Sequence, residues 1–225
     1  MFKTFKKLLG RGEPAAVSAS AGGKTILHID SSILGPYSAS RILSADIVSK
    51  LKAAHPRAPV IRRDLVADPA QHLSAAHIAA FQGGDISDAA LGKDLAKGGA
   101  FIDDLFAADL IVIGAPMYNF SIASQLKGWI DRVCVAGRTF RYTPNGPEGL
   151  LPAGKKVFVV STRGGVYTSG PATTLEHHES YLLVVLGFIG LTDITIVRAE
   201  GLNIGETAKA TAMARAKAQI EALAT

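Results

Sequence analysis

The chain has 225 residues, of which 48% are hydrophobic and 19% charged, and its formal net charge is +5. This length suits one domain with a full core, and this composition excludes a disordered chain. No apolar run reaches the roughly 18 residues of a membrane span. The single cysteine, Cys134, excludes an intrachain disulfide framework and a cysteine metal cluster. We therefore expect a globular, cytoplasmic protein with no integral membrane segment and no metal.

Most of the net charge lies at the amino terminus. Residues 1–24 hold five basic residues and one acid, which leaves 19 basic and 18 acidic residues in the rest of the chain. Because the body is nearly neutral, we predict no nucleic-acid partner. The basic segment and its apolar residues would suit an anionic or lipid surface. We favour a flexible extension over 1–24, followed by a single domain over 25–225.

A hydroxyl-rich loop follows the first predicted strand. The strand, 25–29, is short and apolar, and 30–40 leads into a segment with apolar residues at helical spacing. Ser38 and Ser40 are placed to cap that helix, where backbone N–H groups and the helix dipole attract an anion, and Ser32 would close the cup. The loop therefore suits a phosphate monoester. The alternative is that Ser38 or Ser40 serves as a cap alone, and the G-x-G-x-x-G dinucleotide pattern is absent.

The segment 60–65 predicts the next strand, and its two arginines favour an edge position. Residues 68–107 have helical composition, although Gly98 and Gly99 weaken the middle of this stretch. The uncharged, β-branched run 110–113 then predicts a central strand covered on both faces. We expect Gly114-Ala115-Pro116 to end this strand and helical spacing to resume at Ile122.

The loop 117–121 lies where open α/β sheets bind ligands, at the carboxyl end of a central strand. It has no lysine and no P-loop pattern, so it does not suit a triphosphate. Its two aromatics, Tyr118 and Phe120, and the amide of Asn119 suit a flat ring with polar edges, such as an isoalloxazine. The alternative is a turn with packed aromatic side chains.

Two further segments follow the central helix. Residues 136–150 form a long connection without periodicity, and its aromatics, Phe140 and Tyr142, favour a lid over a ligand or across a subunit boundary rather than a solvated hairpin. Residues 156–161 predict a strand that ends in a glycine-rich loop, 161–165, whose N–H groups suit close approach to a ring edge. The competing interpretation is a simple glycine turn. A helix over 175–189, a strand over 194–197 and a helix over 207–223 complete the chain.

Three loops, each after a predicted parallel strand, therefore converge on one edge of the sheet. A phosphate cup, an aromatic-amide shelf and a glycine edge together describe FMN. The predicted fold is a flavodoxin-like, doubly wound, parallel five-stranded sheet in a three-layer sandwich.

The same residues carry a resemblance to a known family. The sequences Ser-Ser-Ile-Leu at 31–34, Ala-Pro-Met-Tyr-Asn-Phe at 115–120, Thr-Phe-Arg-Tyr at 139–142, Asn-Gly-Pro-Glu-Gly at 145–149 and Arg-Gly-Gly at 163–165 resemble those of the FMN-dependent NADH-azoreductases, which are also NADH:quinone oxidoreductases. The resemblance implies a homodimer with two sites at its interface and a loop around Tyr142 that helps to cover the flavin. It places FMN on the matching positions Ser32, Ser38, Ala39, Ser40, Met117, Tyr118, Asn119, Phe120, Thr162, Arg163, Gly164 and Gly165.

The resemblance also implies a ping-pong, two-electron reaction in which NADH or NADPH reduces the flavin and a quinone or azo compound then reoxidises it. No side chain is assigned as an obligatory acid or base. Tyr142 and His177 are candidate substrate-side residues, and His177 or His178 is a candidate proton donor, although adjacent histidines at a helix start are more often partly solvated. The stretch 172–180 departs from the family pattern, which leaves acceptor preference open. The alternatives are a flavodoxin-type electron carrier and a flavin-free regulatory module.

Overall fold

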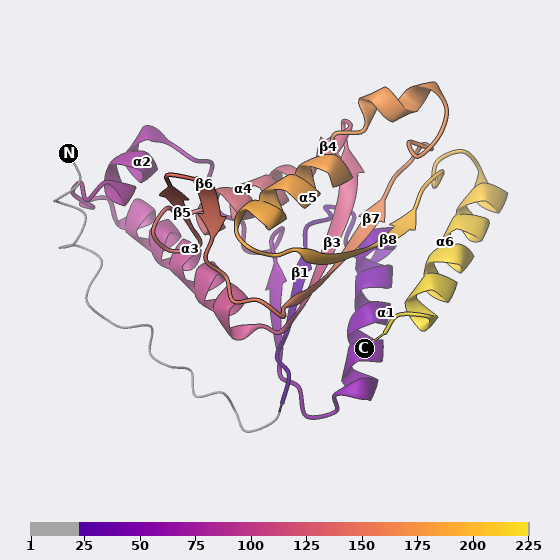
Figure 1. Cartoon of the computed structure of the whole chain (residues 1–225). Helices are drawn as coiled ribbons and strands as arrows, with labels where there is room; N and C mark the ends of the chain where they lie inside the picture. The colour runs from indigo at the N-terminus through magenta and orange to yellow at the C-terminus, as the bar shows by residue number, and fades with distance from the viewer. Residues whose placement is uncertain (1–22, 225) are drawn as a thin grey trace.

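A computed structural model describes residues 23–224, so the predicted extension over 1–24 lies almost wholly outside the described residues. Within this part of the chain, five parallel strands form a sheet in the order β2-β1-β3-β7-β8 (Figure 1). This is the flavodoxin strand order, in which the direction of winding reverses between the first and third strands. The predicted flavodoxin-like, doubly wound sheet is confirmed.

The elements alternate as the sequence predicts. The strands of the main sheet are β1 (Ile26–Asp30), β2 (Val60–Asp64), β3 (Leu110–Tyr118), β7 (Lys156–Thr162) and β8 (Asp193–Ala199). The helices are α1 (Ala39–Ala54), α2 (Ala75–Phe81), α3 (Ala89–Ala107), α4 (Ser124–Val133), α5 (Glu179–Phe188) and α6 (Glu206–Glu221). Short 3₁₀ helices are η1 (Gly35–Tyr37) and η2 (Pro171–Leu175), and the remaining strands are β4 (Ser121–Ile122), β5 (Phe140–Thr143) and β6 (Gly146–Gly149).

Helices cover both faces of the sheet and bury a separate apolar core on each (Figure 1). Helices α1 and α6 pack on one face, where Leu43 and Ile47 contact side chains such as Val112 and Val160. Helices α3, α4 and α5 pack on the other, where Trp129 joins Ile111 and Val159. Because successive residues of a strand point to opposite faces, the uninterrupted apolar run of β3 supplies both cores. This arrangement is the predicted three-layer sandwich.

The central strand is longer than we predicted from the sequence. We expected Gly114-Ala115-Pro116 to end it, but β3 continues to Tyr118, and Pro116 lies in register with Thr162 of β7. On its other side, β1 pairs with β3 only as far as Gly114. Pro116 has no N–H to donate, but it lies beyond the last residue of β1. The side of β3 that faces β1 therefore needs no donor at this position.

The segment between β2 and β3 holds two helices, in agreement with its helical composition, and the glycine pair lies inside α3 without breaking it. Gly98 is where α3 meets α4: a Cβ atom there would lie 3.1 Å from Cδ of Arg132. The glycine that weakens the helical pattern therefore makes room for a buried arginine.

The long connection 136–150 is a two-stranded antiparallel hairpin, with Thr143 paired to Gly146. Our expectation of an aperiodic lid was wrong in this respect. Phe140 packs against Phe188 at the carboxyl end of α5, with ring centroids 4.4 Å apart. The predicted binding edge lies at the opposite, amino-terminal end of α5, so the hairpin does not cover the site of its own chain (Figure 1). Tyr142 is 76% exposed.

Candidate functional site

The phosphate cup is formed by the loop between β1 and α1. Ser38 is the amino-terminal cap of α1, and its Oγ accepts a hydrogen bond from the N–H of Arg41 at 3.2 Å. The Oγ atoms of Ser38 and Ser40 lie 3.0 Å apart, and both side chains are buried. The N–H groups of Ala39 and Ser40 belong to the first turn of the helix, where no intrahelical acceptor exists. Hydroxyls, free N–H groups and the helix dipole therefore meet at one point, which suits a phosphate.

Arg41 holds this loop in place, and the sequence analysis missed it. Its Nε and Nη2 donate to the carbonyl oxygen of Ser32 at 3.1 and 2.9 Å, and its guanidinium forms a bidentate pair with Asp64 at the end of β2. The hydrogen bonds from Arg41 are the main cause that lowers the pKa of Asp64 to about 2. The only sequence signal for this role is an arginine in the first turn of a helix, where a cation is disfavoured by the dipole.

The shelf is a tight turn rather than a loose loop. Strands β3 and β4 pair antiparallel, with Tyr118 opposite Ser121, so Asn119 and Phe120 alone connect them. Both have positive φ, 48° and 71°, which is the geometry of a type I′ hairpin turn. Phenylalanine is unfavourable in this left-handed region, so the turn stores backbone strain at the predicted binding edge.

The cup and the shelf meet through Tyr118. Its hydroxyl lies 3.1 Å from Oγ of Ser32 and accepts a hydrogen bond from the N–H of Ile33 at 3.3 Å. Ser31 adds a second connection, because its Oγ donates to the carbonyl oxygen of Gly114 at 2.7 Å. The first two predicted segments therefore form one continuous surface.

The glycine edge completes the same surface. Pro116 and Thr162 lie side by side in the sheet, and the rings of Phe120 and Tyr167 meet edge to face with centroids 6.3 Å apart. A Cβ atom on Gly164 would lie 2.6 Å from Nδ2 of Asn203, so a larger residue there would displace the Asn203 side chain. The three segments predicted to share a ligand thus lie together at the carboxyl ends of β1, β3 and β7.

The side chain of Arg163, a residue that we predicted at the FMN site, is buried in a cluster of carboxylates. Its side chain is 1% exposed and lies among Glu176, Glu179 and Glu200. Its backbone N–H donates to the carbonyl oxygen of Ala199. Arg163 therefore anchors the glycine edge to the neighbouring strand and to the carboxylates around its side chain. Its contact with a cofactor stays a prediction.

Glu176 is the carboxylate that ties this ion cluster to α5. Burial alone would raise the pKa of Glu176, but the N–H groups of Glu179, His178 and Ser180, together with the charge of Arg163, hold the pKa below its usual value. The two shortest of these hydrogen bonds are 2.6 Å from Glu179 and 2.8 Å from His178. Glu176 is thus ionised at neutral pH and caps the first turn of the helix.

The adjacent histidines have opposite environments, so our expectation of two partly solvated residues was wrong for one of them. His177 is exposed, and its N–H donates to the carbonyl oxygen of Phe120 at 3.1 Å, which places it beside the shelf. His178 is fully buried, with Nδ1 3.4 Å from Oγ of Ser161. Burial, with the charge of Arg163, lowers the pKa of His178 to about 4. His178 is therefore neutral at pH 7 and has no ionisable proton to deliver.

A second set of buried polar groups lies behind the cup. Asp30 at the end of β1 contacts His28, Ser44 and Arg62. Burial raises the pKa of Asp30, but the hydrogen bond from His28 and the nearby arginine charges outweigh it and leave the pKa lowered. Gly114 is required beside this cluster, because a Cβ atom there would lie 3.2 Å from Oδ1 of Asp30.

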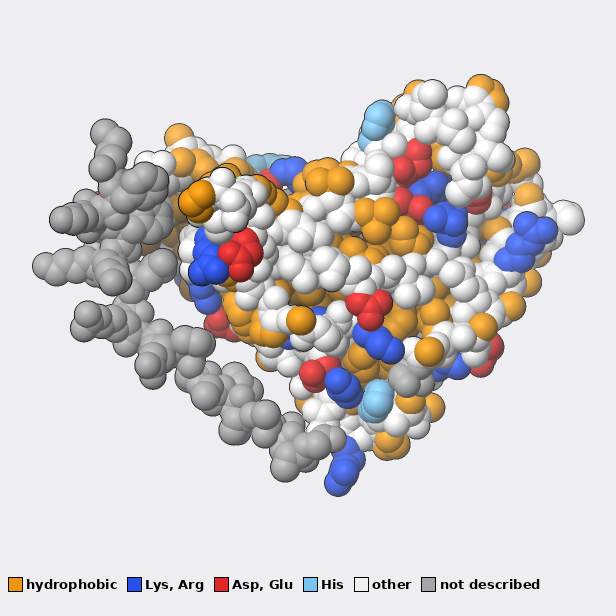
Figure 2. Space-filling model, viewed as in Figure 1, with side chains coloured by type: hydrophobic (Ala, Val, Ile, Leu, Met, Phe, Trp, Pro, Cys, Tyr) orange, Lys and Arg blue, Asp and Glu red, His pale blue; other side chains and the backbone are white. Residues whose placement is uncertain are grey.

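Figure 2 shows basic and acidic side chains lying next to each other over the described part of the face in view. None of the helices described within 23–224 has both the length and the apolar composition needed to cross a membrane. Over the same residues, no group of three or more His, Cys, Asp or Glu side chains is arranged to hold a metal ion.

Burial raises the pKa of the Cys134 thiol to about 11, which makes it a poor nucleophile.

Comparisons with known proteins agree with this geometry. A family model described as flavodoxin-like fold matches residues 24–224. An FMN-dependent NADH:quinone oxidoreductase of Sinorhizobium fredii is 56% identical over 195 residues, which cover 87% of this chain and 94% of the relative. The chain belongs to the family of these FMN-dependent NADH:quinone oxidoreductases, which has the flavodoxin-like fold. A second member, from Rhizobium meliloti, is 53% identical over 195 residues, or 87% of this chain and 94% of its own.

Solved structures give the same result. An azoreductase from Bacillus anthracis str. Sterne superposes with a TM-score of 0.76 at 28% identity, and the match covers 89% of this chain and all of the neighbour. For the fold alone, an FMN-dependent NADH-azoreductase from Bacillus anthracis str. Ames Ancestor, solved in complex with FMN, superposes with a TM-score of 0.78 at 24% identity over 88% of this chain and 96% of its own. The chain therefore resembles its relatives both in sequence and in fold.

Proposed function

We propose that the chain is an FMN-dependent oxidoreductase that uses NADH to reduce quinones and azo compounds. The observation that carries this proposal is the meeting of the cup, the shelf and the glycine edge on one surface, because each matches a different part of FMN. The relatives at 56% and 53% identity are named for the same cofactor and donor. When bound, FMN takes a hydride from NADH and passes two electrons to an acceptor.

The residues of the chain fit this cofactor at each end. The α1 amino terminus, with Ser38 and Ser40, offers an anion site for the phosphate. The turn at Asn119 and Phe120 offers an amide and an aromatic ring. The glycine edge lies beside it, with Gly164 packed against Asn203 and Gly165 against Tyr167. We assign FMN contacts to Ser32 and 38–40 in the cup, to 117–120, and to 162–165. Arg163 positions the last of these segments.

The contribution of these groups to the reaction is positioning and electrostatics. A rigid turn and a loop clamped by buried ion pairs hold a ring in one place, which reduces the entropic cost of reaching the transition state. N–H groups near a ring edge favour the electron-rich state of that ring. His177 lies beside the turn and remains our candidate substrate-side residue, whereas His178 is too deeply buried to reach a substrate.

Initial-rate kinetics test the proposed reaction. With purified protein reconstituted with FMN, we expect NADH oxidation to depend on an added quinone or azo dye, with parallel lines in double-reciprocal plots because donor and acceptor alternate at one site. The assays are anaerobic, because reduced flavin also passes electrons to oxygen. Steady NADH oxidation without added acceptor under these conditions, or intersecting lines, would contradict the alternating mechanism. Comparison of NADH with NADPH under the same conditions decides the donor.

We also propose that the working form is a homodimer in which the hairpin 140–149 of one protomer approaches the site of its partner. Tyr142 lies 76% exposed on this hairpin and far from its own site, and Val184 on α5 is 72% exposed. In the proposed dimer the partner would cover these exposed apolar side chains. Light scattering on the protein as it elutes from a size-exclusion column should give twice the mass of one chain. The variant Tyr142→Ala should raise the KM for the acceptor and leave the flavin content of the protein unchanged.

We place the enzyme in the cytoplasm, because a nearly neutral body with a single thiol suits a reducing compartment that contains NADH. Fractionation of cells that express the full chain tests this placement. If residues 1–24 are a flexible extension, the protein without them should keep its activity. If removing them moves the protein from the membrane fraction to the soluble fraction, these residues attach it to a membrane surface.

A further inference from the structure

A pocket of about 430 Å³ opens beside the shelf, on the side of α4 and α5. Tyr118 and Asn119 of the shelf line it, so it adjoins the place that we assign to the flavin ring. Its other walls include Ser124 and Lys127 of α4 and Tyr181 of α5. An apolar cavity of about 150 Å³ accepts benzene, so this pocket has room for a substituted aromatic ring. A molecule that reaches the flavin can therefore extend one end into the pocket.

Lys127 is the one charged residue in the lining of this pocket, within the part of the chain that the structure describes. Its side chain is 49% exposed, and its Nζ donates to Oδ1 of Asp131, one helical turn further along α4, at 2.5 Å. Asp131 itself is not part of the lining. Because an ammonium group has three N–H donors, Lys127 can contact an anion in the pocket and keep its bond to Asp131.

Two hydroxyl groups add hydrogen-bond donors to the same lining. The exposed Oγ of Ser124 donates to the neighbouring Oε1 of Gln125 at 3.2 Å and is free to rotate towards a ligand. Burial, with the charge of Asp131, raises the pKa of Tyr181 to about 12, so its hydroxyl keeps its proton at neutral pH and can donate it. The described lining contains no carboxylate. One cation and two hydroxyls suit a group that carries several anionic oxygens.

We propose that this pocket receives the anionic group of an aromatic acceptor, a sulfonate or a carboxylate, and that Lys127 sets the preference for such acceptors. This inference rests on the proposed function, because it places the reducible bond of the acceptor beside the flavin and its anionic end at α4. Lys127 binds the anionic oxygens, and Ser124 and Tyr181 donate hydrogen bonds to them. An uncharged quinone lacks these contacts, so its reduction does not depend on Lys127.

Two azo dyes of the same shape test the preference without any turnover. Methyl orange carries a sulfonate, and its sulfonamide analogue replaces that group by an uncharged one. On oxidised, FMN-loaded protein without NADH, calorimetry should give a dissociation constant on the order of 10 to 100 μM for methyl orange, which has about 20 non-hydrogen atoms. The sulfonamide should bind about fivefold more weakly, the upper range for an exposed ion pair. Equal binding of the two dyes, or no heat from methyl orange up to about 1 mM, would overturn the proposal.

Two variants of the same ion pair should change the affinity in opposite directions. Lys127→Gln should weaken methyl orange about fivefold and leave the sulfonamide unchanged, because the cation is lost. Asp131→Asn should strengthen methyl orange about twofold to threefold, because a negative charge beside Lys127 is removed. A disturbed α4 would weaken the dye in both variants, and that result would contradict the assignment.

A second lysine provides the matched control for charge. Lys97 on α3 also pairs with an aspartate, Asp68, and it does not line the pocket. Lys97→Gln should bind methyl orange as the parent does. Equal weakening by Lys97→Gln and Lys127→Gln would show a general effect of net charge and overturn the role of Lys127.

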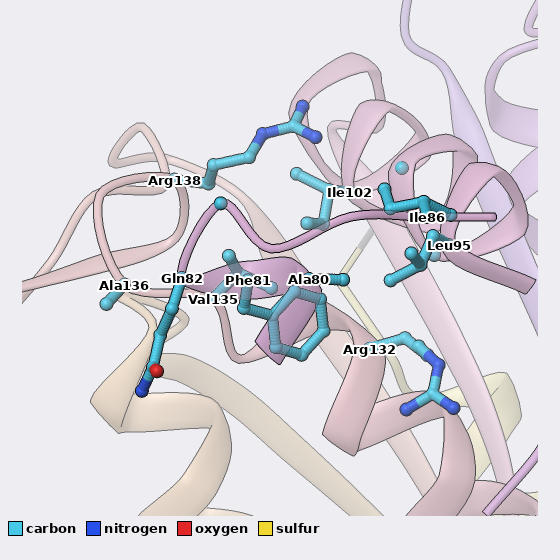
Figure 3. A pocket seen from close by; sticks show the side chains of 13 residues that line it. Ala80, Phe81, Gln82, Ile86, Leu95, Ile102, Arg132, Val135, Ala136 and Arg138 are labelled. Carbon is cyan, nitrogen blue, oxygen red and sulfur yellow. The ribbon is translucent and has the colours of Figure 1, made fainter. Parts of the chain in front are cut away.

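A different cavity, shown in Figure 3, also has room for an aromatic ring. It measures about 190 Å³, lies between α2, α3 and the chain that leaves α4, and has Phe81, Leu95 and Ile102 in its lining. Gly99 lines it inside α3, and a Cβ atom there would lie 3.9 Å from Nη1 of Arg138, so Gly99→Leu should fold and fill this cavity. Methyl orange should bind to Gly99→Leu as to the parent, and loss of binding would place the dye in the cavity of Figure 3 and overturn the proposal.

Steady-state kinetics separate this inference from the proposed function. Lys127→Gln should raise the KM for methyl orange about fivefold and leave kcat, the KM for NADH and the rate with p-benzoquinone at their parent values. A rise in the KM for NADH alone would assign Lys127 to the donor and contradict the inference. If the parent reduces p-benzoquinone and Lys127→Gln treats both dyes as the parent does, this inference fails and the proposed function stands. If methyl orange binds as expected but NADH reduces neither dye nor quinone, the proposed function fails and the assignment of the anion to Lys127 stands.

Discussion

The hydroxyl of Tyr118 lies 3.1 Å from the hydroxyl of Ser32, and this contact joins the end of the central strand to the loop that follows the first strand. The two residues are 86 positions apart in the chain. The parallel sheet brings them together, because it places the carboxyl ends of β1 and β3 next to each other. One molecule can therefore place its phosphate at the amino terminus of α1 and its ring beside the turn at 119–120.

Removal of that contact should weaken cofactor binding without unfolding the chain. In Tyr118→Phe we expect the dissociation constant of FMN to rise about tenfold, which corresponds to the loss of about one hydrogen bond. Quenching of flavin fluorescence on titration into apoprotein measures this. Tyr37→Phe is the matched control, because Tyr37 is 89% exposed, and the prediction is wrong if both variants bind FMN equally.

The cup can be tested with two flavins that differ in the phosphate alone. Ser40→Ala should reduce the affinity for FMN about tenfold and leave the affinity for riboflavin unchanged, since the lost hydroxyl lies 3.0 Å from that of Ser38 in the proposed phosphate site. The same fluorescence titration gives both constants. If riboflavin binding falls as much as FMN binding, the serine acts on the fold of the loop rather than on the phosphate.

The strained turn predicts an unusual order of stability at position 120. Phe120 has a φ of 71°, which glycine adopts freely and a β-branched residue does not. The unfolding free energy of apoprotein should therefore be lower in Phe120→Val than in Phe120→Gly by about 1–3 kcal/mol. Chemical denaturation measures the difference, and a more stable valine variant would show that the turn is not strained. Both variants should lose turnover, because the aromatic ring proposed to lie beside the flavin is gone.

Buried His178 predicts a specific dependence of stability on pH. Its folded-state pKa is lowered to about 4, whereas an unfolded histidine titrates near its usual value of about 6.5. Between these two values the unfolded chain binds more protons, so stability is full above about pH 6.5 and falls on the order of 3 kcal/mol as the pH drops to about 4. Urea unfolding across this range should show a shallower slope in His178→Asn. His177→Asn, at an exposed neighbour, should keep the parent slope, and identical slopes in all three proteins would contradict the assignment.

The sequence predicts well those features that depend on local order. Each binding loop directly follows an apolar strand, so the parallel topology alone brings Ser32, Asn119 and Gly164 to one edge. The register between strands was not predictable in this way. From the sequence, Pro116 indicates the end of a strand. The sheet tolerates this proline because β1 ends before it, and where β1 ends relative to β3 depends on how the two strands pair.

Features that depend on distant partners were missed. Arg163 looks like a polar loop residue until the fold surrounds it with Glu176, Glu179 and Glu200. His178 looks like one until the fold buries it beside Ser161. The hairpin had a local signal, since Pro144-Asn145-Gly146 is a typical turn sequence, but its strands are four residues each and carry no clear alternation. The sequence therefore predicted the site's chemistry and missed much of what holds it in place.

Anaerobic absorption spectroscopy of the reconstituted protein tests the central claim most directly. If the three loops hold one FMN in a working site, the purified protein is yellow, one equivalent of NADH bleaches the visible flavin bands, and a quinone restores them. A protein that binds no flavin on reconstitution, or that holds flavin which NADH does not bleach, would contradict the account.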